Sequence, residues 1–197
     1  MRIFVVIVFL IGSLTLTAQQ EEIQKDFEDY LELIQSQQFD EAMDYMYPEF
    51  FDLMSREMMV TLMEQTFNSP ELTISLSAPT IDSIGSVEYL DSMYFAPVNY
   101  THFMTMKFNP EEGETEEDIR FRDELTVASL KIKFGKDKVT YDSVSNEMLI
   151  TSHKLVYARS EDGEDEWKFI ELDPENMYMI KSMIPEELYN RAINQSR

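Results

Sequence analysis

The stretch from Tyr94 to Phe108 constrains the fold of this 197-residue chain more than any other. From Tyr100 onward its side chains alternate between two faces, one with Tyr100, His102, Met104, Met106 and Phe108, the other with Thr101, Phe103, Thr105 and Lys107. A repeat of two residues is typical of a β-strand with one buried face. We therefore predict that residues 94–108 form the central strand of a curved sheet that helices cover.

The chain before this strand has mainly helical periodicity. An amphipathic helix is predicted over residues 21–37, where apolar residues share one stripe: Ile23, Phe27, Tyr30, Leu31 and Ile34. Asp40 is expected to cap a short second helix that Pro48 ends, and Ser55 a third helix over residues 56–67. Strand alternation begins at Leu72 and continues beyond a kink at Pro79, and residues 87–90 are expected to pair back.

Residues 116–134 are predicted to form a helix after the central strand. Thr115 and Asp118 resemble a capping box, and Gly135 is expected to end the helix. Helical spacing relates Phe121, Leu125, Ala128 and Ile132. Strand alternation fits Ala128, Leu130, Ile132 and Phe134 equally well, so the sequence leaves both structures open.

The rest of the chain predicts an antiparallel meander and a helical tail. Short strands are expected near residues 139–141, 148–151, 154–158 and 167–172. His153, between two of them, is expected at the surface in a turn. The tail covers residues 174–197, with Pro185 starting its last helix. This order predicts an α+β fold, with N-terminal helices packed on a curved, mainly antiparallel sheet.

The N-terminus has the layout of a secretory signal peptide. Arg2 is followed by an apolar run over residues 3–16, by the small residues Thr17 and Ala18, and by polar residues 19–22. This pattern predicts removal of residues 1–18, export to the periplasm or the medium, and a single domain over residues 19–197. An uncleaved membrane anchor is the alternative, because Leu16 occupies a position where a small residue is preferred.

The composition argues against several kinds of partner. The chain has 38 acidic and 16 basic residues and a net charge of -22, so we expect no nucleic-acid partner and no membrane contact after signal cleavage. The lack of cysteine excludes disulfides and thiolate ligands. No cofactor and no metal site is expected, because there is no phosphate-binding glycine loop and His102 and His153 are isolated. The acidic runs 111–118 and 161–166 are interpreted as solvated turns rather than Ca²⁺ sites.

The order of elements resembles the nuclear transport factor 2-like superfamily, especially secreted members from Bacteroidetes-type bacteria. The residues that carry this resemblance are 44–51, 55–58 and 167–170. The resemblance implies a cone-shaped α+β fold, and relatives often join sheets face to face as homodimers. No catalytic residue is carried over, because enzymes of the superfamily use Asp, Tyr or His at differing positions and this chain has no matching motif.

The strand face with Tyr100, His102, Met104 and Met106 is the candidate ligand site, since a cone fold would aim it into the cavity. We expect an exported, non-catalytic module that binds a small apolar ligand or a protein partner. One alternative is a small enzyme for a hydrophobic substrate, with His102 as acid or base, Tyr100 as donor and Asp82 as the nearby carboxylate. The ordinary structural explanation is a core or rim His102 with one hydrogen bond. A further alternative is a structural or dimerisation subunit with an exposed apolar sheet face.

Three motifs resemble the Asp-Ser/Thr-hydrophobic acceptor for O-glycans in secreted Bacteroidetes proteins. Their acceptor residues are Ser83, Ser92 and Ser143. Turn chemistry explains the same residues, because Asp and Ser side chains bond their own backbone at strand ends. Both explanations can hold together, since an acceptor must be exposed, and we predict modification at one or more of these serines.

Overall fold

The computed structural model describes residues 2–173 and 177–195, with side chains from residue 18 to 173 and from 177 to 194. The helical N-terminal part has α1 (Arg2–Gln35), α2 (Phe39–Ala42), η1 (Met43–Tyr45), η2 (Pro48–Asp52) and α3 (Arg56–Phe67). The predicted helix over 21–37 is the second half of α1, which also contains most of the predicted signal segment. The third helix is confirmed, with Ser55 accepting a hydrogen bond from the Met58 amide.

The sheet is antiparallel between all its named strands. Its strands are β1 (Leu72–Ile84), β2 (Glu88–Leu90), β3 (Met93–Phe108), β4 (Val139–Asp142), β5 (Glu147–Ser160) and β6 (Lys168–Glu171). Their order is β1-β3-β5-β4, with β2 also pairing with β3 and β6 with β5. The prediction that residues 94–108 form the central strand is therefore confirmed. The kink in β1 is also present, as two register shifts between Ser77 and Ser83.

The prediction of two short strands within β5 is wrong, because β5 is continuous from Glu147 to Ser160. His153 consequently lies within a strand, opposite Thr101 of β3, and not in a turn. Its exposure to solvent agrees with the sequence prediction. The polar residues near His153 suggested a break in the strand, but the hydrogen bonds of a ladder come from the partner strands and tolerate polar side chains.

The two faces of the sheet pack against different helices. On one face, Ala96, Val98 and Tyr100 of β3 pack with α1 and with two aromatic residues, Trp167 and Phe169. On the other face, Phe95, Tyr157 and Ile170 pack with the segment that holds α5 (Met177–Ile180) and α6 (Glu186–Gln195). Residues 174–176 of the predicted helical tail lie outside the described residues. The helices thus cover both sides of the end of the sheet where β2 and β6 lie.

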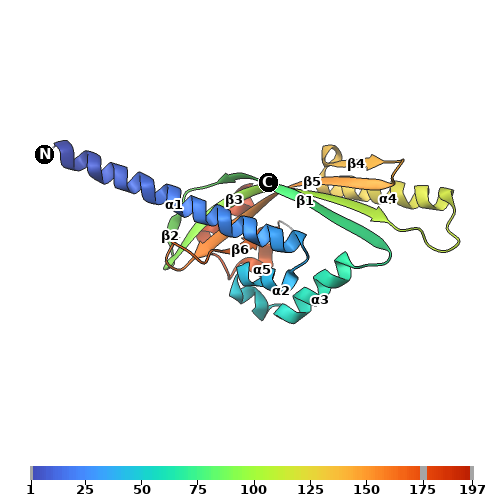
Figure 1. Ribbon diagram of the computed structural model, residues 1–197, viewed down its shortest axis with the longest axis horizontal. Coiled ribbons are helices and arrows are strands. Elements are labelled where there is room, and N and C mark those ends of the chain that lie inside the picture. Colours follow the sequence, from blue (N-terminus) through green and yellow to red (C-terminus); the bar gives the residue numbers. More distant parts are fainter. Residues whose placement is uncertain (1, 174–176, 196–197) are drawn as a thin grey trace.

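The other end of the sheet has its own small core, formed with α4 (Glu116–Phe134). Met104, Met106 and Phe108 of β3 pack there with Val127 of α4 and with Val139, Met148 and Ile150 from β4 and β5. Figure 1 shows α4 beside β4 and β5, at the end of the molecule away from the start of α1. The alternative between helix and strand is settled as helix, with the predicted capping box of Thr115 and Asp118.

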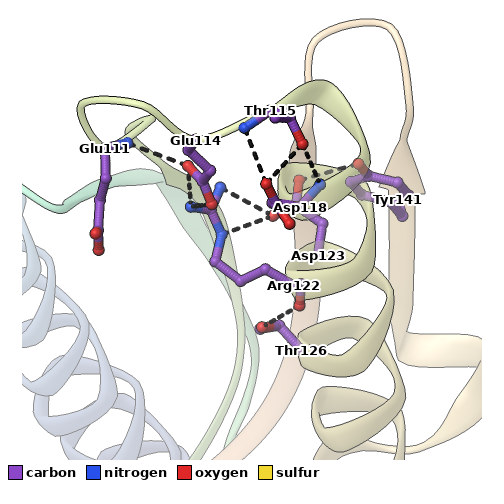
Figure 2. Close-up of polar contacts among 8 residues, drawn as sticks. All are labelled: Glu111, Glu114, Thr115, Asp118, Arg122, Asp123, Thr126 and Tyr141. Atoms are coloured by element: carbon purple, nitrogen blue, oxygen red, sulfur yellow. Dashed lines mark hydrogen bonds and ion pairs between the residues drawn. The ribbon is translucent and has the colours of Figure 1, made fainter.

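A buried carboxylate anchors the first turns of α4 (Figure 2). The side chain of Asp123 is 1% exposed. It accepts a hydrogen bond from the Tyr141 hydroxyl of β4 at 3.0 Å and lies 3.3 Å from the Arg122 guanidinium. Arg122 also forms two bonds to Glu114, at 2.6 and 2.8 Å, and its guanidinium lies 5.1 Å from the centre of the Phe108 ring. These contacts fix the face that α4 turns toward the sheet.

Replacing Asp123 with alanine is expected to lower the free energy of unfolding by about 1–3 kcal/mol, because Arg122 loses a buried partner and the Tyr141 hydroxyl is left with the Asn146 side-chain oxygen, at 3.1 Å, as its acceptor. Glu124→Ala is the matched control, since Glu124 is the exposed neighbour on the same helix. Urea unfolding followed by circular dichroism measures both variants. Equal stability of the two variants would contradict the anchoring role of Asp123.

Candidate functional site

An apolar pocket of about 300 Å³ lies where α1, η2, β6 and α5 meet. Its lining consists mainly of aromatic and aliphatic side chains with two carboxylates: Tyr30, Met46, Phe50, Phe169, Ile170, Glu171, Asp173, Met179 and Ile180. The volume lies at the lower end of the range for small-molecule sites. The pocket is therefore suited to a compact apolar group.

The walls of the pocket come from the edge of the sheet. Successive residues of a strand point to opposite faces, so a pocket lined by both Phe169 and Ile170 must wrap around this edge. Met46, between η1 and η2, forms an isolated parallel bridge with Phe169. The ring of Tyr30 stacks on that of Phe169, with centroids 6.0 Å apart and planes at 23°. One side of the pocket is thus a preformed aromatic wall.

Arg159 of β5 holds the η2 segment in place beside the pocket. Its guanidinium donates two hydrogen bonds to the Glu49 carboxylate, at 2.9 and 2.8 Å. It also lies 4.1 Å from the centre of the fully buried Tyr47 ring. A bidentate pair combined with a cation–π contact fixes orientation better than a single ion pair. Met46 and Phe50, on either side of this anchor, are therefore positioned in the pocket wall.

Glu171 is the polar centre beside the pocket. Its carboxylate accepts hydrogen bonds from the Tyr100 hydroxyl at 3.1 Å and from Lys154 Nζ at 2.5 Å. Burial, together with the charge of Glu171, raises the pKa values of Tyr30 and Tyr100. Both phenols therefore remain protonated at neutral pH. A carboxylate has about four lone-pair positions, so Glu171 retains capacity for a further donor.

His102 lies on the same face of β3 as Tyr100, opposite Ser152 of β5. Burial lowers its pKa; the charge of Glu171 opposes this shift and that of Lys154 adds to it. The ring is therefore neutral at pH 7. Among the described residues, the lining of the apolar pocket does not include His102. The carboxylate whose charge reaches His102 is that of Glu171, not that of Asp82.

Asp82 belongs to a separate network on the opposite face of the sheet. The Thr101 hydroxyl donates to Asp82 Oδ2 at 2.8 Å and lies 2.9 Å from His153 Nδ1. Lys138 Nζ lies 2.6 Å from His153 Nε2. An ammonium group only donates, so the bond directions assign a neutral His153 whose Nδ1–H donates to Thr101. Three strands and the segment before β4 are tied together in this way.

The four residues of the predicted ligand face do not gather around one cavity. Tyr100 is buried in the core under α1, with its ring 5.1 Å from that of Phe27. Met104 and Met106 pack in the separate core under α4. Tyr100 contacts the pocket lining through its bond to Glu171. The sequence offered a weak signal for the pocket in the aromatic run of residues 45–51 and in two acidic residues, one at the end of the last strand and one just after it, Glu171 and Asp173.

The described residues contain no group of three or more His, Asp or Glu side chains arranged to hold a metal ion. Within that part of the chain, no helix has the length and apolar character needed to cross a membrane. In the acidic turn, Asp162 accepts hydrogen bonds from Ser160 and from the Glu164 and Asp165 amides. The carboxylate of Asp162 is therefore bonded within the turn, and the Gln19 side chain of α1 donates to the Gly163 carbonyl at 2.9 Å.

The three predicted glycan acceptors are all exposed. Ser92 lies in the turn between β2 and β3, and Ser143 in the turn between β4 and β5. Ser83 lies in β1 and accepts a hydrogen bond from the Asn99 amide at 3.2 Å. Their modification stays a prediction.

Comparison with known proteins found no relative of this chain. No family model, no curated protein and no solved structure matches the chain.

Proposed function

We propose that this protein is an exported, non-catalytic binding module whose apolar pocket takes a small ligand. The observation that carries the proposal is the pocket of about 300 Å³ with aromatic and aliphatic walls. The signal-peptide pattern of residues 1–18 supports export. Helices packed on a curved antiparallel sheet agree with a nuclear transport factor 2-like fold, which forms part of the same proposal.

The lining suggests the chemistry of the ligand. An apolar body would contact Tyr30, Phe50 and Phe169, whose rings are among the largest groups in the pocket. A hydrogen-bond donor on the ligand, such as an amine or a hydroxyl, would find an acceptor in Glu171. An anionic ligand is disfavoured, because Glu171 and Asp173 both lie in the lining.

The geometry supports binding more than acid–base catalysis. A general acid or base must come within hydrogen-bond reach of the reacting atom, directly or through one water. His102 is not among the residues that line the pocket, and the two charged groups that act on its pKa, Glu171 and Lys154, are paired with each other. The lowered pKa of His102 thus favours the enzyme alternative without any supporting geometry in the pocket.

Binding of N-phenyl-1-naphthylamine, a neutral apolar fluorophore with one N–H donor, tests the proposal. We expect its emission to rise on binding to the protein, and Met179→Trp to weaken this binding about tenfold or more by filling the pocket, a loss of about 1.4 kcal/mol. The matched control is Tyr178→Trp, which places the same side chain at a position that is 73% exposed on the same helix.

Two results would contradict the proposal. One is the absence of any rise in emission with the unmodified sequence. The other is equal binding to the Met179→Trp and Tyr178→Trp variants, since that would place the probe outside the pocket.

A further inference from the structure

The helix α4 exposes an apolar stripe that has no partner among the described residues. Phe121 is 63% exposed, Leu125 55% and Ile132 87%. Ala128, between Leu125 and Ile132, is exposed as well. The opposite side of the helix packs on the sheet through Val127, Leu130 and Phe134. The helix therefore has two apolar sides, of which the intramolecular core uses one.

The stripe has the spacing of a helix-pairing seam. Its members follow one another at intervals of four, three and four residues. Alternating intervals of three and four residues are typical of core positions in coiled coils. The stripe covers most of the helix, which runs for 19 residues from Glu116 to Phe134. Its geometry suits a second helix better than an irregular loop.

The net charge of α4 reverses along the helix. The first half, residues 116–125, carries five acidic and two basic side chains, and the second half carries Lys131 and Lys133 with no acidic residue. A symmetric dimer must use the same surface on both copies, so that surface has to be complementary to itself. An antiparallel arrangement places the acidic half of one helix against the basic half of the other. A parallel arrangement would bring like charges together.

An antiparallel pair centred between Leu125 and Ala128 also matches large residues with small ones. Phe121 would face Ile132 of the second copy, and Leu125 would face Ala128 of the second copy. Next to this seam, Glu124 would lie opposite Lys131 of the second copy, twice by symmetry. Knobs-into-holes packing needs this kind of size complementarity, and the flanking charges select the orientation.

We propose that α4 is a self-association surface, on which two copies of this chain pair their α4 helices antiparallel through Phe121, Leu125, Ala128 and Ile132. The position of α4 at one end of the molecule leaves the helix accessible to a second copy (Figure 1). A single short helix pair buries less area than a standard interface, so the association belongs to the weak, reversible class. An anionic membrane is a poorer occupant, because the chain has a net charge of -22.

Sedimentation velocity of the full-length protein, from about 1 µM to several hundred µM, tests this proposal by covering the range of weak dimers. We expect a reversible monomer–dimer equilibrium that Leu125→Glu abolishes. Leu149→Glu is the matched control: Leu149 is 47% exposed and lies on β5. Its neighbours Met148 and Ile150 face α4, so Leu149 points to the other side of the sheet. Circular dichroism checks that both variants fold.

Exchanging the charges of Glu124 and Lys131 tests the antiparallel orientation of the two α4 helices. Glu124→Lys and Lys131→Glu should each weaken the dimer, and the double variant should restore it, because the exchange rebuilds the same pair. A protein that stays monomeric throughout the range would overturn the proposal. So would a dimer that survives Leu125→Glu, or a double variant that is weaker than both single ones. The result is independent of ligand binding in the pocket, which lies beside α1 and β6.

Discussion

Replacing Trp167 with alanine is expected to lower the free energy of unfolding by about 3–5 kcal/mol, the range for removal of a large buried aromatic side chain. Trp167 is the largest side chain that is fully buried. It packs with Ile23 and Phe27 of α1 on one face of the sheet. Its backbone amide also donates to the Asp26 carboxylate at 3.1 Å. The loss would therefore weaken the contact between α1 and the sheet.

Chemical unfolding of this variant has to be followed by circular dichroism, because the chain contains 1 Trp. Trp167→Phe is the graded control. It leaves a smaller cavity and removes an indole N–H that is buried without a hydrogen-bond partner in the described part of the chain. We expect less than half the loss of the alanine variant. A Trp167→Ala protein as stable as the unmodified one would show that α1 does not pack on the sheet as described.

The second large effect is expected at Gly163, in the turn before Trp167. Its φ of +76° is in the region that favours glycine, and an added Cβ would lie 2.8 Å from Cγ of the Tyr94 ring. We expect Gly163→Ala to cost about 2–4 kcal/mol, from the left-handed backbone and from overpacking together.

Gly113→Ala separates these two causes. Gly113 has a similar φ of +89°, but no atom lies within 4 Å of the position of its Cβ. Only the backbone cost of about 1–2 kcal/mol is expected there. Urea unfolding of both variants measures the difference between their free energies of unfolding. Equal losses of stability in the two variants would show that the close contact between residue 163 and Tyr94 adds nothing to the cost of the Gly163→Ala substitution.

Local signals predicted much of the secondary structure. Residues 56–67 became a helix because a serine cap precedes an amphipathic run, and residues 116–134 because a capping box and a final glycine bracket them. The central strand followed from its alternation. These signals lie within a few residues of each other, so no knowledge of tertiary contacts was needed.

These local signals could not predict which side of a helix packs against the sheet, as α4 shows. Both of its sides have apolar residues at helical spacing, one with Val127 and one with Leu125. Asp123 is buried and bonds to Tyr141, which belongs to a separate element, β4. The side of α4 that carries Val127 is buried as well. Similarly, the polar neighbours of His153 suggested a turn, and its bonding partner Thr101 on the next strand is too far away in the sequence to give a local signal.

The pocket could not be predicted for the same reason. Its walls come from α1, from the residues around η2, from β6 and from α5, and no local motif joins them. The predicted ligand face on β3 instead divides between two cores, because α1 covers Tyr100 while α4 covers Met104 and Met106. Alternation identifies the face of a strand, but not how far each helix extends along it.

The most direct test of the binding site is a titration of the protein, labelled with carbon-13 at its methionine methyl groups, with N-phenyl-1-naphthylamine. Methionine-to-leucine variants assign the signals. We expect the methyl signals of Met46 and Met179 to shift in proportion to bound probe, because both side chains line the pocket. Those of Met104 and Met106, buried under α4, should stay in place. Shifts at Met104 and Met106 with none at Met46 and Met179 would contradict the pocket as the binding site, and so would a saturated protein with no methyl shift at all.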